Sequence, residues 1–182
     1  MKIPNLLTVA RILLIPVFVL LYYLPQAWSP LAAALVFGAA ALTDWFDGYL
    51  ARRLDQSTPF GAFLDPVADK LMVVVALVLL VETFDHPWVT IPSAIIIGRE
   101  IVISALREWM AEIGERASVS VSYIGKIKTT LQMIAILLLV AFTPYSMLSW
   151  VGIVALYGAT LLTLWSMVIY LRAAWPLLVE DI

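Results

Sequence analysis

The sequence predicts an all-α, polytopic membrane protein with six transmembrane helices, and three observations lead to this fold class. Hydrophobic residues make up 63% of the 182 residues and charged residues only 13%, whereas soluble domains carry about 25% charged residues. The mean hydropathy is +1.00. Apolar stretches recur along the chain at about the 20-residue length that a helix needs to cross a bilayer.

The elements follow one another as apolar stretches separated by Pro, Gly and charged residues. The six predicted spans cover residues 6 to 24, 30 to 53, 60 to 82, 88 to 110, 122 to 143 and 149 to 172. Because they use nearly the whole chain, we expect one integral membrane domain over residues 1 to 182. Before the first span, Asn5, Thr8 and Arg11 recur at helical spacing. This N-terminal segment is expected to form a short interfacial helix at the membrane surface.

The distribution of basic residues predicts the orientation in the membrane. The loops after the first, third and fifth spans contain no Lys or Arg. The opposite ends of the spans carry Arg52, Arg53, Arg107, Arg116, Lys126, Lys128 and Arg172. Cytoplasmic loops are the ones enriched in Lys and Arg. Both termini are therefore expected in the cytoplasm.

Composition also excludes several kinds of site. The net charge of −2 argues against a nucleic-acid partner. The absence of Cys excludes thiolate metal ligands and a Cys nucleophile. The one histidine, His86, lies in a predicted outer loop and is expected to be a solvated surface residue.

Four aspartates stand inside these apolar spans. Asp44 and Asp47 lie one turn apart in the second span, and Asp65 and Asp69 lie one turn apart in the third. A charged Asp at the bilayer centre costs about 2.5 to 3.5 kcal/mol, so four close together require compensating cations. Oxygen ligands without His or Cys select hard cations. The pattern therefore predicts two divalent cations, Mg²⁺ or Mn²⁺, that would clamp a phosphoryl group.

Small residues accompany the aspartates. Gly48, Ala51 and Gly61 lack the bulk that would keep a diphosphate or nucleotide away from the backbone. Small residues also let membrane helices pack closely, and for the glycines alone both interpretations stay open. Together with the aspartates they favour a functional site, because ionisable residues inside a membrane are usually functional.

Basic residues approach the same depth from other helices. Arg99 lies deep in the fourth span, and Arg107 continues its face two four-residue steps later. Lys126 and Lys128 stand at the start of the fifth span. These cations predict a site for an anion that opens toward the cytoplasm. The alternatives are a buried ion pair between Arg99 and Glu100, and lysines that only anchor the helix at the membrane surface.

The pattern Asp44-x2-Asp47-Gly48-x2-Ala51-Arg52-x8-Gly61-x3-Asp65-x3-Asp69 resembles the signature of the CDP-alcohol phosphatidyltransferases at every position. The likeness extends over nearly the whole chain, through Pro4-Asn5-x-x-Thr8-x-x-Arg11, Arg99-Glu100 and Gly125-Lys126-x-Lys128-Thr129. It implies a homodimer in the bacterial cytoplasmic membrane, with a cytoplasm-facing cavity that holds two divalent cations.

The resemblance also implies roles for individual residues. Asp44, Asp47 and Asp65 would be metal ligands, and Asp69 would lie near the second ion and act as the general base. The CDP part of the lipid nucleotide would lie along Asn5, Thr8, Gly48, Arg52, Thr58 and Gly61, with Ala51 leaving room for it. The acceptor phosphate would bind Arg99, Arg107, Lys126 and Lys128.

The expected reaction is transfer of the phosphatidyl group from CDP-diacylglycerol to glycerol 3-phosphate, with release of CMP. One alternative is a sister transferase that uses serine, inositol phosphate or phosphatidylglycerol as acceptor. An alternative from another class is a divalent-cation transporter, but the outer halves of the acidic helices are apolar where a permeation path would need polar residues. A prenyltransferase also pairs aspartates with Mg²⁺, although its usual aspartate spacing differs from the one here.

Overall fold

Six helices form the described part of this computed structural model. The backbone is described for residues 3–54, 59–114 and 123–180, and the side chains at 3–7, 44–54, 59–63, 65, 123–124, 177–178 and 180 lie outside the described set. The helices are α1 (Ile3–Tyr23), α2 (Ser29–Leu54), α3 (Pro59–Phe84), α4 (Pro87–Glu112), α5 (Tyr123–Ala141) and α6 (Met147–Glu180). No strand occurs within these ranges. The predicted all-α class with six helices is confirmed.

Two boundaries differ from the predicted spans. The residues expected to form a short interfacial helix are the first turns of α1 rather than a separate element. Neither Gly nor Pro interrupts the chain between Asn5 and Ile15, so nothing in the sequence ends a helix there. At the other end of the chain, α6 continues past residue 172 and through Pro176 to Glu180.

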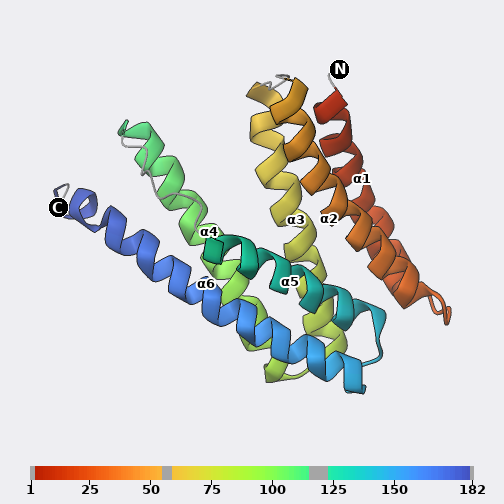
Figure 1. Ribbon diagram of the computed structural model, residues 1–182. Helices are drawn as coiled ribbons and strands as arrows, with labels where there is room; N and C mark the ends of the chain where they lie inside the picture. The colour runs from red at the N-terminus through yellow and green to blue at the C-terminus, as the bar shows by residue number, and fades with distance from the viewer. Residues whose placement is uncertain (1–2, 55–58, 115–122, 181–182) are drawn as a thin grey trace.

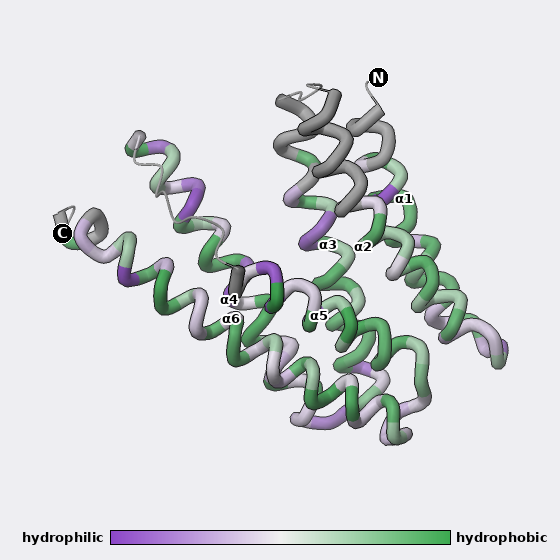
Figure 2. The backbone as a smooth tube through the Cα atoms, viewed as in Figure 1, coloured by the Kyte–Doolittle hydropathy of each residue, from purple (hydrophilic) through white to green (hydrophobic). Residues whose placement is uncertain are grey.

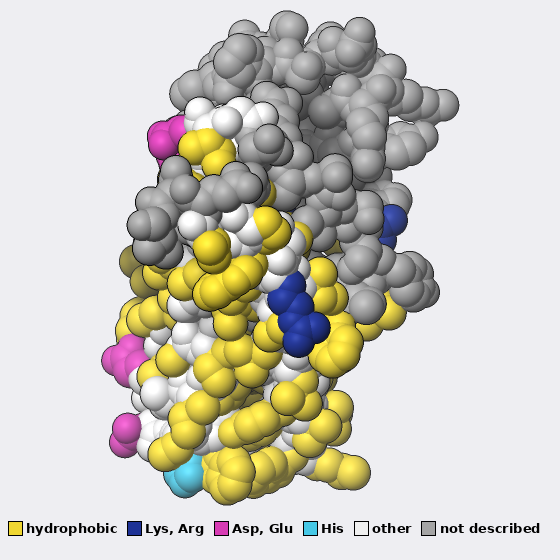
Figure 3. Space-filling model, turned by 90° about the vertical axis from the view of Figure 1, so that its left-hand side faces the viewer, with side chains coloured by type: hydrophobic (Ala, Val, Ile, Leu, Met, Phe, Trp, Pro, Cys, Tyr) yellow, Lys and Arg dark blue, Asp and Glu magenta, His cyan; other side chains and the backbone are white. Residues whose placement is uncertain are grey.

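The apolar character of the helices fits a membrane protein. Among the described residues, Pro87–Glu112 and Met147–Pro176 are long and apolar enough to cross a membrane, and Thr8–Tyr23 and Ser29–Thr43 are shorter apolar helical stretches. Hydrophobic residues dominate the middle of the helices (Figure 2). Large apolar side chains also cover the face seen in Figure 3. On α6, Val154 is 70% exposed and Trp165 63% exposed, which suits contact with lipid better than contact with water.

The connections between helices that the structure describes in full lie at one end of the molecule (Figure 1). Figure 1 shows the connections at residues 24–28, 85–86 and 142–146 toward one side of the molecule, which we call the loop side. Helix α1 packs on α2 and α3, α2 packs on α5, and α6 packs on both α4 and α5. Toward the opposite side, the ends of α4 and α6 separate from the ends of α1, α2 and α3 (Figure 1).

The hydrophobic core fills the loop-side half. Its fully buried members include Phe18, Phe37, Leu77, Ile96 and Leu156. Close helix contacts accompany this core, because a Cβ added at Gly152 or Gly158 of α6 would lie 3.0 Å from a leucine side chain of α5. The other half of the molecule, which we call the cavity side, holds the polar residues described next.

Candidate functional site

A cavity of about 380 Å³ lies on the cavity side between α3, α4, α5 and α6. Its ionisable lining residues are Asp69 and Lys70 from α3, Arg99, Glu100 and Arg107 from α4, and Lys128 from α5. Gln132 of α5 and Ser166 and Tyr170 of α6 add uncharged polar groups. Of the side chains that the structure describes, four basic and two acidic ones therefore line the cavity, an excess of two positive charges. Such a charge balance in a partly buried site favours an anionic ligand.

Helical periodicity explains why these residues meet. Lys128 and Gln132 are four residues apart on α5, and Ser166 and Tyr170 are four residues apart on α6, so each pair presents one face to the cavity. On α4, Arg99 and Arg107 lie on the same stripe, with the buried Ile103 between them. Each helix thus contributes two turns to the cavity wall.

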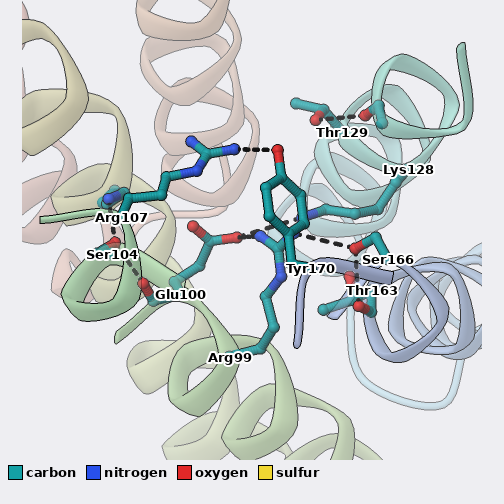
Figure 4. Close-up of polar contacts among 11 residues, drawn as sticks. Arg99, Glu100, Ser104, Arg107, Lys128, Thr129, Thr163, Ser166 and Tyr170 are labelled. Atoms are coloured by element: carbon teal, nitrogen blue, oxygen red, sulfur yellow. Dashed lines mark hydrogen bonds and ion pairs between the residues drawn. The ribbon is translucent and has the colours of Figure 1, made fainter. Parts of the chain in front are cut away.

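Glu100 organises two of the cations (Figure 4). Its Oε1 atom lies 2.6 Å from Nη1 of Arg99 and 3.3 Å from Nζ of Lys128. Arg99 also donates from Nη2 to Oγ of Ser166 over 3.0 Å. The ion pair between Arg99 and Glu100, which the sequence left as an alternative, is therefore present. It does not displace Arg99 from the cavity, since both residues line it.

The remaining two cations are held by neutral partners. Arg107 donates from Nη2 to the hydroxyl of Tyr170 at 2.5 Å, and its guanidinium carbon lies 4.9 Å from the centre of the same ring. Lys70 donates to Oγ of Ser104, which in turn donates to the backbone carbonyl of Glu100. Among the described side chains, no carboxylate forms an ion pair with Lys70 or Arg107, so their charge is available to a ligand.

Of the four predicted metal ligands, Asp69 is the one whose side chain the structure describes, and it is also the predicted general base. It is half-buried, lines the large cavity, and also lines a small adjoining cavity with Arg11 and Met133. The side chains of Asp44, Asp47 and Asp65 lie outside the described residues. Among the side chains that are described, no group of three or more metal-ligating residues occurs.

The backbone nevertheless places the four aspartate positions at matching depths. Helices α2 and α3 pack together, Asp44 is ten residues from the end of α2 at Leu54, and Asp69 is ten residues from the start of α3 at Pro59. Each position is thus about 15 Å from its helix end at 1.5 Å per residue. Asp47 and Asp65 lie at similar, shallower levels.

The other predicted site residues either do not line the cavity or have side chains outside the described set. Thr8 is fully buried on α1 and is not among the cavity-lining residues. Lys126 is exposed and also lies off the cavity wall, although its neighbour Gly125 lines it. The side chains of Asn5, Ala51 and Arg52, like the glycine positions 48 and 61, lie outside the described set, and Thr58 lies wholly outside the described residues.

Sequence reasoning missed four residues that shape the cavity. Gln132 lies one turn after Lys128, so helical spacing from a predicted residue was a usable signal for it. Lys70 directly follows Asp69, and because adjacent helix positions do not face each other, spacing gave no such signal there. Ser166 and Tyr170 stand in an otherwise apolar stretch of α6. Their spacing of one turn gave a weaker signal, because isolated Ser and Tyr are common in membrane helices.

Comparisons with known proteins identify the family of the chain. The family model described as CDP-alcohol phosphatidyltransferase matches residues 1–172. The chain is 60% identical over 173 residues to the CDP-diacylglycerol–glycerol-3-phosphate 3-phosphatidyltransferase of Escherichia coli strain K12, covering 95% of this chain and 94% of that protein. The protein of the same name from Shigella flexneri shows the same identity and coverage. The chain therefore belongs to the CDP-alcohol phosphatidyltransferase family.

Proposed function

We propose that this protein transfers the phosphatidyl group of CDP-diacylglycerol to glycerol 3-phosphate, giving phosphatidylglycerophosphate and CMP. The relatives at 60% identity carry the name of this activity. The observation that carries the proposal is that one cavity joins Asp69 to the cations Arg99, Arg107 and Lys128. A carboxylate beside a cationic site suits an acceptor that has both a hydroxyl and a phosphate.

The cations supply the binding energy for the acceptor phosphate. Arg99 and Lys128 are oriented by Glu100, and Arg107 by Tyr170. Prepositioned guanidinium and ammonium groups form short, charge-assisted hydrogen bonds to phosphate. Lys126 is kept in the proposal as a surface contribution to the same anion, since it lies two residues from Lys128.

Asp69 is the general base in this proposal. The acceptor hydroxyl gives its proton to the Asp69 carboxylate while its oxygen bonds to the phosphorus that carries the diacylglycerol. The bond from that phosphorus to the bridging oxygen of the diphosphate breaks, and CMP leaves with that oxygen. Among the described residues that line the cavity, Ser166 is the only serine. Its hydroxyl accepts a hydrogen bond from Arg99 and donates one to the Thr163 carbonyl and not to a base, so direct transfer is favoured over a phosphatidyl-enzyme intermediate.

Two divalent cations, Mg²⁺ or Mn²⁺, would be held by Asp44, Asp47, Asp65 and Asp69. When bound they would neutralise charge on the diphosphate and on the departing CMP. The matching depths of the four positions on α2 and α3 support this assignment. The CDP moiety would lie along the family positions Asn5, Thr8, Gly48, Ala51, Arg52, Thr58 and Gly61.

The protein is proposed to lie in the bacterial cytoplasmic membrane as a six-span homodimer with both termini in the cytoplasm. The positive-inside distribution of Lys and Arg supports this orientation. The cavity would then open to the compartment that supplies a soluble acceptor. The acyl chains of the lipid substrate would stay in the bilayer.

Acceptor competition tests the proposal. The detergent-purified protein is incubated with CDP-diacylglycerol, Mg²⁺ or Mn²⁺, and either glycerol 3-phosphate, serine, inositol phosphate or phosphatidylglycerol, and CMP and the lipid product are measured. We expect CMP release with glycerol 3-phosphate alone, and none when the metal is chelated. Turnover with another acceptor would assign a sister transferase. Metal flux in liposomes without CMP release would instead assign a transporter.

A further inference from the structure

Gln132 carries a polar atom that the proposed reaction has not used. The residue is 5% exposed, and its Oε1 atom is buried with no hydrogen-bond partner among the described residues. The same side chain lines the large cavity. Buried amide oxygens are normally paired, because losing their hydration without a new donor is costly. An acceptor in this condition on a cavity wall indicates a ligand that brings a donor.

Two other buried oxygens show that the cavity is what distinguishes Gln132. The hydroxyl oxygens of Ser93 and Thr163 also have no partner among the described residues, but neither residue lines the cavity. These two oxygens therefore cannot contact a ligand in the cavity, whereas the oxygen of Gln132 can.

The place of Gln132 suits the middle of a short acceptor. It lies one turn beyond Lys128 on the same face of α5, about 6 Å further along the helix axis. The next residue, Met133, lines both cavities together with Asp69. An acceptor whose phosphate meets Arg99 and Lys128 therefore extends its carbon chain past Gln132 toward the base.

The chemistry of the amide selects which part of the acceptor it meets. An ionised phosphate oxygen has no hydrogen to donate to a carbonyl oxygen, whereas a hydroxyl both donates and accepts and so pairs with either end of an amide. Glycerol 3-phosphate has two hydroxyl groups, of which one attacks phosphorus. We propose that Gln132 accepts a hydrogen bond from the other hydroxyl, at C2, and is thereby a specificity-determining residue. This inference rests on the proposed function.

The test compares two acceptors that differ only at C2. Propane-1,3-diol monophosphate keeps the phosphate and the attacking hydroxyl of glycerol 3-phosphate but lacks the middle one. A buried polar group left unpaired by a substrate analogue lowers its kcat/KM, here by about 10- to 100-fold in the wild-type protein. In Gln132→Met, which keeps the side-chain length without the acceptor, that ratio is expected to fall to near 1, mainly through a higher KM for glycerol 3-phosphate.

Ser93→Ala is the matched control, because it removes a buried unpartnered oxygen outside the cavity and should keep the wild-type ratio. Gln132→Leu is a second variant in case the Met variant does not fold. Equal kcat/KM values for the two acceptors in the wild-type protein would overturn the inference without any variant. So would a wild-type ratio that persists in Gln132→Met. Absence of wild-type turnover with glycerol 3-phosphate would instead overturn the proposed function.

Discussion

The loop-side and cavity-side halves of the helices are built on opposite principles. On the loop side, most buried residues are apolar, as Phe18, Leu77 and Ile96 are, and glycines of α6 let α5 approach closely. On the cavity side, the described side chains of α3, α4 and α5 place four cations and two carboxylates around a space of about 380 Å³. We infer from this contrast that close packing on the loop side makes the structure rigid. The charges on the cavity side are tolerated because a bound ligand of opposite charge would balance them. Substitutions on the cavity side should therefore lower activity, and substitutions on the loop side should lower stability.

The largest effect is expected at the base on the cavity side. Asp69→Asn keeps the size of the side chain but cannot accept the hydroxyl proton, so kcat should fall by about 10²- to 10⁴-fold, the usual contribution of a general base. Binding of CDP-diacylglycerol should change far less. CMP release and isothermal titration with the lipid nucleotide measure the two quantities. Retained turnover in this variant would remove Asp69 from its assigned role.

Two lysines on α5 give a sharper test within the cavity side. Lys128 lines the cavity and pairs with Glu100, whereas Lys126 is exposed and lies off the wall. Lys128→Met should raise the KM for glycerol 3-phosphate by about 10- to 100-fold, because a charge-assisted contact to phosphate is lost. Lys126→Met should change that KM about twofold or less, as expected of a solvent-screened charge. Equal effects of the two substitutions would contradict the placement of the cavity.

On the loop side, the expected failure is in stability and not in chemistry. A Cβ at Gly152 would lie 3.0 Å from Leu139 Cγ and 3.2 Å from Leu138 Cβ, so Gly152→Ala overpacks the contact between α5 and α6. Overpacking costs about 1–3 kcal/mol of unfolding free energy. Thermal unfolding in detergent measures the loss, and kcat per folded molecule should be unchanged.

Gly98→Ala of α4 is the control for this substitution. Apart from its chain neighbours and the backbone of its own helix, no atom lies within 4 Å of a Cβ added there, and Ala is favoured over Gly inside a helix by about 1 kcal/mol. The control should therefore melt at the wild-type temperature or above it. A control as unstable as Gly152→Ala would show that loss of glycine, and not the close helix contact, causes the effect.

The two halves also differ in how far the sequence predicts them. The apolar stretches predict the helices and the acidic pattern predicts the depth of the site, because hydropathy and helical spacing are local properties. Of the predicted basic residues, the structure brings Arg99, Arg107 and Lys128 to the cavity and leaves Lys126 outside it. The rotation of a helix about its axis decides between positions two residues apart, and that rotation depends on packing against other helices.

The same limit explains the partners that sequence reasoning did not assign. Ser166 and Tyr170 reach Arg99 and Arg107 only because α6 packs on α4, across more than 60 positions of the chain. Glu100 adjoins Arg99 in sequence and was considered as its partner, but its second contact with Lys128 depends on α5. Contacts between distant helices depend on the tertiary fold, and local patterns in a single sequence do not predict them.

Among the substitutions on the cavity wall, the smallest effect is expected where a neutral group orients a cation. Tyr170→Phe removes the hydroxyl that accepts a hydrogen bond from Arg107 and keeps the ring that the guanidinium faces at 4.9 Å. Because the contact with the ring survives and Arg107 is exposed, the KM for glycerol 3-phosphate should rise only about three- to tenfold, a typical value for one hydrogen bond. Tyr170→Leu removes both contacts and should raise the KM further. If the two variants have the same KM, the ring contributes nothing and Arg107 is positioned by the hydroxyl alone. If neither changes it, Arg107 reaches the acceptor without help from Tyr170, and the contribution of α6 to the site is limited to Ser166, which holds Arg99.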